Sequence, residues 1–354
     1  MRKQKAKGKG QKAKGLSKWL IALVAVPLVA QQAAVKTGMK LGDFNLHDPF
    51  VLAHKASQTY YLYNSAGGPI TGGKGAGVLA YKSKDLDTWD GPYLVFTVPA
   101  GIWANPAHGA WAPEVHEYKG KYYLFVTLHN RDKLIPQPAP ELRPIYQKVN
   151  APHHLRATQI CVADSPDGPF KVHGPRMQPP EDFMTLDGTL FVENGAPWMV
   201  YAHEWIQVLD GTMEAVPLKP DLSEAAGPPI LLFKASDAPW LQDQQKAANR
   251  QRTYVTDGAQ FYRTKTGKLL MIWSSYRDGL YVETLAHSVS GTLKGPWKQG
   301  EVLVGEDSGH GMIFRSFDNR LMLILHQPFN RAKGKLFEIE DAGDTVRIKR
   351  QLVY

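Results

Sequence analysis

Short runs of β-branched and aromatic residues, each bounded by Gly, Asp or Pro, recur from about residue 44 to the end of the chain. Such runs are typical of strands separated by turns. No segment of this part of the chain has the apolar spacing of a long amphipathic helix. The pattern therefore predicts an all-β protein.

The runs recur in the same order five times. Each repeat has an opening segment followed by two or three further strand-like runs. The copies begin about 50 to 75 residues apart, the spacing of a repeat architecture. One small sheet cannot bury both of its faces alone, so the copies must stack on one another. A sandwich or a solenoid would also repeat, but the variable inserts between copies favour blades around an axis. The sequence thus predicts a five-bladed β-propeller over residues 44–354. The five openings are His47–Val51, Trp111–Val115, Leu186–Leu190, Thr256–Gln260 and Gly309–Ile313.

The N-terminus has a different composition. Eight of the nine net positive charges lie in residues 1–18, and 12 apolar residues, Trp19–Ala30, follow directly. A basic segment, a short apolar run and a small residue are typical of a secretory signal peptide. We expect residues 1–30 to be a signal peptide, residues 31–43 to be a short linker, and the protein to be secreted or periplasmic. A membrane anchor is the alternative, although a spanning helix needs about 20 apolar residues.

Charge and cysteine content exclude other classes. Without the basic leader the chain is almost neutral, so no basic face for nucleic acid is expected. Cys161 is the only cysteine and lies in an apolar run, so neither an internal disulfide nor a reactive thiol is expected. After removal of the leader, no stable membrane insertion is expected. The oligomeric state is left open.

The candidate chemistry lies in the five openings. The first strand of each blade lines the central channel, so residues at its start are expected to meet at one mouth. These residues are Asp48, Asp187, Asp257 and His310, with Glu114 in the second copy. Carboxylates that share one pocket cannot all ionise cheaply, so their pKa values must separate. One protonated and one ionised carboxyl is the requirement for acid-assisted cleavage of a glycosidic bond.

Several segments in this order resemble glycoside hydrolase family 43. The resemblance extends from about residue 44 to the C-terminus and implies a five-bladed propeller that inverts the anomeric carbon. It also implies action mainly on arabinose- and xylose-containing polysaccharides, and less often on galactans. The segments are His47–Pro49 with Tyr60–Leu62, Trp111–Glu114 with Gly120–Leu124, Leu186–Gly188, and Gly309–Gly311.

The resemblance also implies roles for three residues. Asp48 is expected to be the general base, and Asp187 the second carboxylate, which orients the acid and raises its pKa. His310 matches a histidine that often lies over the channel near a metal ion or water. No cofactor is expected to be required, although Ca²⁺ or another ion could bind in the channel near His310.

The general acid is ambiguous. Many members of the family open the fourth blade with Glu-Gly, whereas this chain has Asp257-Gly258. Glu204 is the alternative, because the second strand of a blade returns toward the mouth and Trp205 could shield the carboxyl from water. We prefer Glu204 as the acid and keep Asp257 as its rival.

Substrate contacts are expected from residues around the same mouth, since flat sugar faces stack on aromatic rings. The predicted substrate-binding residues are Phe50, Trp111, Glu114, Trp205, Asp257 and His310.

Together these features predict a secreted inverting glycoside hydrolase. It would release arabinose or xylose units from plant-type polysaccharides, as an α-L-arabinofuranosidase or β-xylosidase does. An endo-arabinanase, an exo-galactanase and a non-catalytic carbohydrate-binding propeller are the alternatives.

Overall fold

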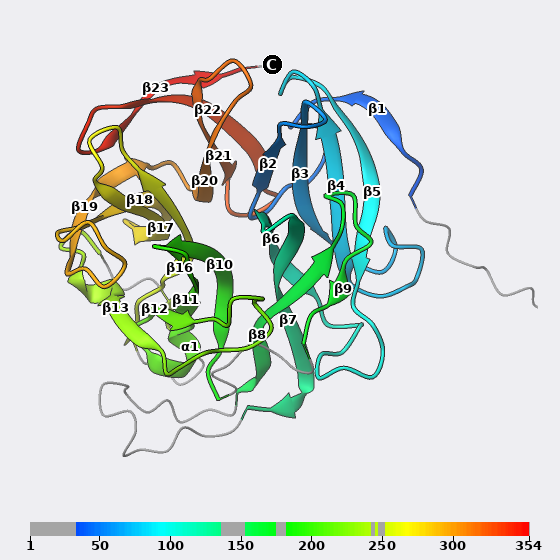
Figure 1. Cartoon of the computed structure of the whole chain (residues 1–354), viewed down its shortest axis with the longest axis horizontal. Helices are drawn as coiled ribbons and strands as arrows, with labels where there is room; N and C mark the ends of the chain where they lie inside the picture. Colours follow the sequence, from blue (N-terminus) through cyan, green and yellow to red (C-terminus); the bar gives the residue numbers. More distant parts are fainter. Residues whose placement is uncertain (1–32, 136–152, 175–181, 242–244, 247–251, 354) are drawn as a thin grey trace, which may run out of the picture.

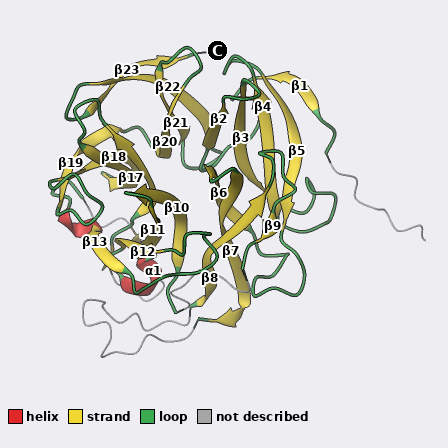
Figure 2. Ribbon diagram, in the orientation of Figure 1, coloured by secondary structure: helices red, strands yellow, loops and turns green. Residues whose placement is uncertain are grey.

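The computed structural model describes residues 33–135, 153–174, 182–241, 245–246 and 252–353. This part of the chain is almost entirely strand and loop (Figure 2). Its helical segments are a single turn of α-helix, α1 (Trp205–Val208), and a 3-10 turn, Ala235–Asp237. The all-β prediction is confirmed. The predicted signal peptide lies outside the described residues, and among those that are described no helix has the length and apolar character needed to cross a membrane.

The strands form antiparallel meanders in chain order. The first sheet has the order β1-β5-β4-β3-β2. Its strands are β1 (Lys36–Met39), β2 (Phe50–His54), β3 (Thr59–Ala66), β4 (Gly77–Ser83) and β5 (Trp89–Thr97).

The second and third meanders are joined by one parallel pairing, Thr185 with Ala157, between β10 and β8. The second consists of β6 (Ala110–Tyr118), β7 (Lys121–Leu134), β8 (His154–Ala163) and β9 (Lys171–Val172). The third consists of β10 (Thr185–Glu193), β11 (Ala196–His203), β12 (Thr212–Pro217) and β13 (Ile230–Lys234).

The fourth and fifth meanders are separate four-stranded sheets. The fourth is β16 (Asp257–Arg263), β17 (Leu269–Arg277), β18 (Leu280–Ser288) and β19 (Trp297–Val304). The fifth is β20 (Gly309–Arg315), β21 (Leu321–Gln327), β22 (Lys333–Asp341) and β23 (Val346–Leu352). A short hairpin, β14 (Gln245–Lys246) with β15 (Arg252–Thr253), precedes the fourth sheet.

The five meanders are arranged around a common centre (Figure 1). The first strands contact one another in a closed cycle, from β2 to β6, β10, β16, β20 and back to β2. The starts of strands that are about 50 to 75 residues apart in the chain are thereby brought together.

Hydrophobic clusters between neighbouring sheets hold this arrangement. One cluster joins the first sheet to the second and the fifth, and others join the second to the third, the third to the fourth and the fourth to the fifth. Large side chains such as Trp89, Tyr63, Phe125 and Trp273 are fully buried in them. Because each such side chain contributes about 1.5–3 kcal/mol on burial, packing between sheets is the main source of stability.

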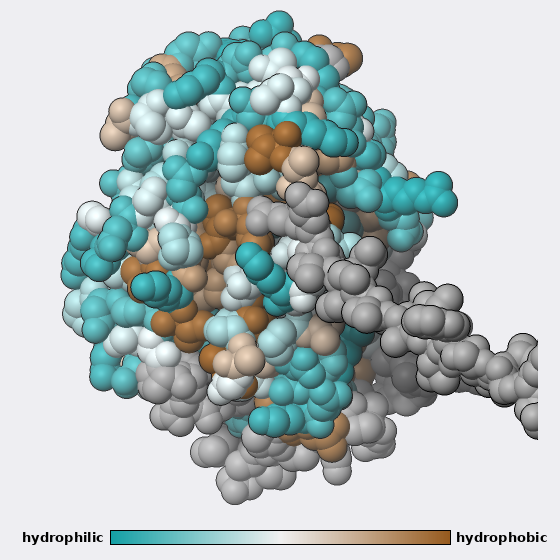
Figure 3. Space-filling view, turned by 90° about the vertical axis from the view of Figure 1, so that its right-hand side faces the viewer, coloured by the Kyte–Doolittle hydropathy of each residue, from teal (hydrophilic) through white to brown (hydrophobic). Residues whose placement is uncertain are grey.

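The N-terminal segment differs from its prediction. Lys36–Met39 belong to the predicted linker, residues 31–43, but form β1, which pairs with β5 at the outer edge of the first sheet. Four residues without a long apolar run give no strand signal on their own, so the pairing was not evident. The face of the molecule on this side is largely hydrophilic, with hydrophobic residues gathered near its centre (Figure 3).

We expect Tyr63→Phe to lower the free energy of unfolding by about 1–2 kcal/mol. The buried Tyr63 hydroxyl donates a hydrogen bond of 2.8 Å to the carbonyl of Pro166 and so ties the first sheet to the second. Urea unfolding measures the change. Tyr93→Phe is the matched control, because the half-buried Tyr93 hydroxyl makes no hydrogen bond within the described residues. Equal stability of the two variants would contradict the prediction.

Candidate active site

The first strands enter the centre of the molecule through an irregular residue. In β6, β10, β16 and β20 the pairing with the next strand shifts near the start, as at a β-bulge. The residue at the shift has a positive φ, and Asp48, just before β2, has one too. Bulges of this kind re-aim side chains and are frequent beside active sites. The five residues are Asp48 (φ 50°), Ala112 (42°), Asp187 (51°), Gly258 (39°) and His310 (49°).

Four of these five positions are not glycine, so the backbone is strained there. A left-handed conformation costs an L-residue about 1–2 kcal/mol, and such strain persists only where the surroundings impose it. Side chains from the preceding sheet accept the N–H groups of three of these residues. These hydrogen bonds are Asp187 N to Thr127 Oγ1 (2.9 Å), His310 N to Ser274 Oγ (2.7 Å) and Asp48 N to His326 Nδ1 (3.2 Å).

The strained residues bring the predicted carboxylates together around one imidazole. His310 Nδ1 lies 3.2 Å from Asp48 Oδ1, 3.8 Å from Asp187 Oδ2 and 3.9 Å from Asp257 Oδ1. Three carboxylates and a histidine from four different sheets therefore form one cluster.

Asp257 reaches the cluster from a different position than the repeat predicts. Gly258, not Asp257, is the fourth-sheet residue with the positive φ. The ladder pairs Asp257 with Ser274, as it pairs Leu186 with Ala202 just before the bulge at Asp187. Alignment of Asp257 with Asp48 and Asp187 was thus wrong by one residue.

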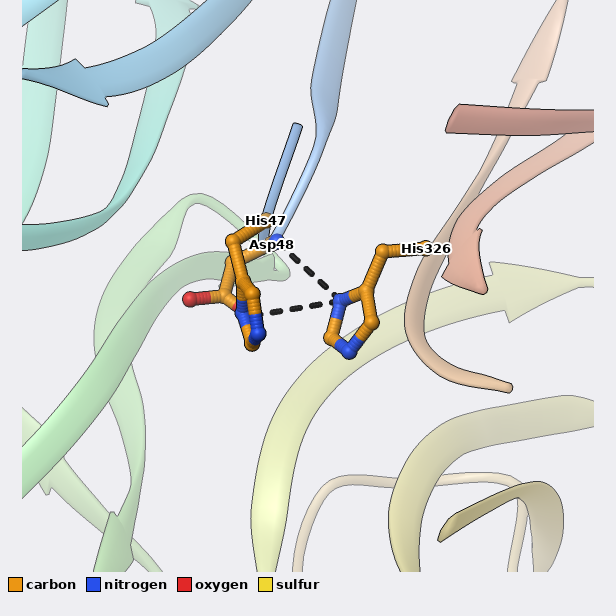
Figure 4. A group of neighbouring side chains, drawn as sticks. All are labelled: His47, Asp48 and His326. Carbon is orange, nitrogen blue, oxygen red and sulfur yellow. Dashed lines mark hydrogen bonds and ion pairs between the residues drawn. The ribbon is translucent and has the colours of Figure 1, made fainter. Parts of the chain in front are cut away.

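Asp48 is held ionised by its histidine neighbours. His47 Nδ1 lies 2.9 Å and His326 Nδ1 3.4 Å from Asp48 Oδ1 (Figure 4). Burial alone would raise the pKa of Asp48, but the charges of His310 and His47 hold that pKa well below its usual range. Burial would likewise lower the pKa of His47, yet Asp48 raises it to about 9. Asp48 and His47 therefore form an ion pair at neutral pH.

Asp187 is the opposite case. Burial, with the nearby charges of Asp257 and Asp48, raises the pKa of Asp187 well above its usual range. Only 4% of its side chain is exposed, against 19% for Asp48. Gly258 N donates to Asp187 Oδ2 at 3.4 Å. The pKa values of Asp48 and Asp187 are thus shifted in opposite directions, and both carboxyl groups lie near His310 Nδ1.

Asp257 is the most exposed carboxylate of the cluster, at 21%. The buried Tyr281 hydroxyl donates a 2.6 Å hydrogen bond to Asp257 Oδ2. This hydrogen bond fixes the orientation of the Asp257 carboxyl group.

Glu204 lies at the end of β11, where its side chain is 5% exposed. Burial raises the pKa of Glu204, the Arg156 guanidinium opposes this rise, and the charge of Asp257 adds to it. Arg156 Nη1 donates to Glu204 Oε1, whereas buried Glu204 Oε2 has no hydrogen-bond partner within the described residues. A carboxyl with one oxygen held and one free can carry a proton on the free oxygen.

Two of the predicted aromatic contacts, Trp111 and Trp205, lie near Glu204. Trp111 is 37% exposed, and its ring packs 4.8 Å from the Arg156 guanidinium that holds Glu204. Trp205 follows Glu204 directly as the first residue of α1 and is half-buried.

Phe50 and Glu114 do not join the cluster. Phe50 lines a chamber of about 290 Å³ together with His116, and Glu114 Oε2 lies 2.9 Å from His116 Nε2. None of the clustered carboxylates lines this chamber. The reason is distance along the strand, since two residues advance a side chain by about 6.6 Å while keeping it on the same face.

Arg156, Tyr281 and Glu283 belong to the site but were not found in the repeat pattern. Glu283 is fully buried and accepts hydrogen bonds from Gly311 N (2.6 Å) and Ser274 Oγ (3.2 Å). Burial raises its pKa to about 8. An isolated charged residue inside an otherwise apolar strand was the available signal for Arg156 and Glu283.

Among the residues that the structure describes, two groups of side chains could bind a metal ion. Asp187, Asp257 and His310 offer ligand atoms within 4.8 Å of one another, and so do His47, Asp48 and His326. The first group has two carboxylates and one imidazole and includes the predicted His310. Carboxylate oxygens are the ligands that Ca²⁺ prefers, so the donor chemistry of this group fits a divalent cation.

Carboxylates kept in different protonation states around one pocket define the chemistry of glycoside hydrolases. The chain belongs to the glycosyl hydrolases family 43, whose family model matches residues 42–350. The prediction of an inverting glycoside hydrolase is confirmed at the level of this family.

Three known proteins illustrate the similarity. An endo-arabinase structure from Bacteroides thetaiotaomicron VPI-5482 is 35% identical, with a TM-score of 0.73 over 86% of this chain and 98% of that one. A thermostable family-43 glycoside hydrolase is 19% identical, with a TM-score of 0.64 over 90% and 94% of the two chains, and shows the same fold. The extracellular endo-α-(1→5)-L-arabinanase 1 of Bacillus subtilis (strain 168) is 32% identical over 113 residues, or 30% of this chain. The matched region spans a third of that arabinanase, 33% of its length.

We expect Gly258→Ala to lower kcat by about 10²-fold, because a Cβ there would lie 2.8–3.0 Å from the His310 ring and displace it. Steady-state kinetics measures the loss. Gly267→Ala is the matched control, since Gly267 also has a positive φ (83°) but no atom within 4 Å of its Cβ position. If both variants lose activity equally, the effect comes from backbone strain and not from His310.

Proposed function

We propose that the five meanders form a five-bladed β-propeller whose central carboxylates hydrolyse arabinan by single displacement. The closed cycle of first strands and the clusters between neighbouring sheets support the propeller. The convergence of Asp48, Asp187, Asp257 and His310 at the starts of the first strands is the observation that carries the function.

The substrate assignment rests on the two relatives above 30% identity. Both are named as arabinan-cleaving endo-enzymes. We therefore place internal cleavage of α-1,5-linked arabinan first. Release of terminal arabinose or xylose, the first choice from the sequence, is the second candidate, and product size distinguishes the two.

Asp48 acts as the general base. Its carboxylate is accessible and held ionised by His310 and His47, so it can take a proton from the attacking water over a wide pH range. The positive charge of His47 stabilises the ionised carboxylate of Asp48 against the desolvation that burial causes.

Glu204 acts as the general acid. Its raised pKa favours the protonated form that an acid needs, and its free Oε2 can hold the proton. Asp257 remains the rival because it is more exposed. The hydrogen bond from Tyr281 orients Asp257 for contact with substrate hydroxyls, and the charge of Asp257 raises the Glu204 pKa.

Asp187 and His310 organise the centre. The raised pKa of Asp187 favours its protonated form, and His310 Nδ1 lies 3.2–3.9 Å from all three carboxylates. If a divalent cation binds, Asp187, Asp257 and His310 would hold it, and it would supply positive charge beside the sugar ring. Trp111 offers a ring for stacking.

The location follows the same reasoning. The leader in residues 1–30 has the features of a signal peptide, and the Bacillus subtilis relative is named as extracellular. We propose secretion, with a polysaccharide as the partner.

We expect the wild-type protein to release arabino-oligosaccharides from arabinan, and Asp48→Asn to lose at least about 10²-fold of this activity while remaining folded. Chromatography of products from arabinan, arabinoxylan, xylan and galactan gives the substrate and the mode of attack. Monomer as the first product would support terminal release instead. Binding without hydrolysis by the wild-type protein would indicate a carbohydrate-binding propeller.

We expect Glu204→Gln to slow hydrolysis of the polysaccharide far more than hydrolysis of an activated aryl glycoside. A good leaving group departs without protonation, so loss of the acid matters little there. The ratio of kcat/KM values on the two substrates is the measurement. Asp257→Asn is tested beside it, and the leaving-group dependence in that variant alone would assign the acid to Asp257.

A further inference from the structure

The Arg156 side chain is buried in the second sheet and contacts four other side chains. Its Nη1 donates to Glu204 Oε1, its Nε donates to His129 Nδ1 at 3.1 Å, and its Nη2 lies 3.3 Å from His154 Nε2. The guanidinium also packs on the Trp111 ring, with 4.8 Å to the ring centroid. A buried arginine with this many contacts has one geometry available to it.

The two imidazoles beside Arg156 are neutral. Burial lowers the pKa of His154 to about 4, and the Arg156 charge adds to this lowering. Burial and Arg156 likewise hold the pKa of His129 far below its usual value. Neutral imidazoles accept hydrogen bonds from the guanidinium but carry no charge that could form an ion pair with Glu204. Among the described contacts, Glu204 is the only carboxylate that pairs with Arg156.

The charged and titratable groups around Glu204 come from β11, which Glu204 directly follows, and from two other strands, β8 and β16. Arg156 on β8 and His203 on β11 lower the Glu204 pKa, and Asp257 on β16 raises it. His203 itself is bound to Glu214, with Nδ1 and Oε1 3.0 Å apart. The guanidinium is the neighbour in direct contact with the Glu204 carboxyl.

We propose that Arg156 is a positioning residue that fixes Glu204 through Oε1 and leaves Oε2 as the oxygen that carries and delivers the proton. The inference rests on the proposed role of Glu204 as the acid. Two effects follow from the contact. The planar guanidinium of Arg156, by holding Oε1, sets the direction of Glu204 Oε2. Its positive charge also opposes the rise in the Glu204 pKa that burial causes.

The test compares Arg156→Gln, Arg156→Lys and the wild-type chain. Gln removes the charge, so the Glu204 pKa rises, the acid stays protonated to higher pH, and the alkaline limb of the kcat–pH profile moves to higher pH. Lys keeps the positive charge but lacks the planar guanidinium that holds Glu204. We therefore expect kcat to fall about ten-fold or more while the alkaline limb of the kcat–pH profile stays at the same pH. Arg315→Gln, at the far end of β20 on an exposed side chain, is the control and keeps wild-type kinetics.

A second readout follows Glu204 without catalysis. Glutamate labelled with ¹³C at Cδ is titrated by NMR in each chain, and the Glu204 signal is identified by its absence in Glu204→Gln. The expected result is a higher midpoint in Arg156→Gln than in the wild type. An unchanged midpoint would overturn the inference.

The two readouts separate the two ideas. If the Glu204 midpoint rises but the alkaline limb of kcat does not move, Arg156 controls Glu204 as proposed and Glu204 is not the acid. If Arg156→Gln does not fold, Arg156→Lys decides, since wild-type kcat in that variant shows that the planar guanidinium does not position the acid.

Discussion

The left-handed residue at the start of each first strand is the constraint on which the site depends. Three of these residues, Asp48, Asp187 and His310, contribute their side chains to the central cluster, and in the same three a side chain of the preceding sheet accepts the backbone N–H. The strain of about 1–2 kcal/mol per residue is therefore balanced by contacts that exist only when two sheets are packed together. The geometry of the carboxylates is thus a property of the interfaces between sheets, and the hydrophobic clusters at those interfaces determine the chemistry as well as the stability.

Electrostatics then divides the roles among groups that belong to one cluster. Asp48 is surrounded by histidines and stays ionised, whereas Asp187 has carboxylates as neighbours and keeps a proton. Glu204 is set apart from both in the second strand of its sheet, with Arg156 as its direct partner. A site made of similar acids acquires different functions from the neighbours each acid has, not from the acids themselves.

The sequence predicted the repeats, the all-β class and the convergence of Asp48, Asp187, Asp257 and His310, because these follow from strand periodicity and from one residue type recurring in one place. It misplaced Asp257 by one residue, because the Asp-Gly pair at 257–258 resembles the one at 187–188, whereas the ladder aligns Gly258 with Asp187. It placed Phe50 and Glu114 at the mouth because side-chain alternation gives the face of a strand but not the depth along it. Arg156, Tyr281 and Glu283 lie on β8 and β18, the third strands of their sheets, and their partners are distant in sequence, so no local pattern could pair them with the site.

The outer strands of the sheets must also be kept from pairing with other molecules, and the short strand β1 contributes to this. β5 is rich in apolar residues, and without β1 its free edge would be a template for another strand. β23, at the outer edge of the fifth sheet, has Arg347, Lys349 and Arg350 instead, and repels a partner by charge. β1 pairs with β5 through Lys36 with Gly91 and Met39 with Trp89, so a cut N-terminal to Lys36 would keep this pairing, whereas a cut a few residues later would remove it and expose the start of the β5 edge. If the proposed leader is cleaved, the solubility of the folded product therefore limits where the cut can fall.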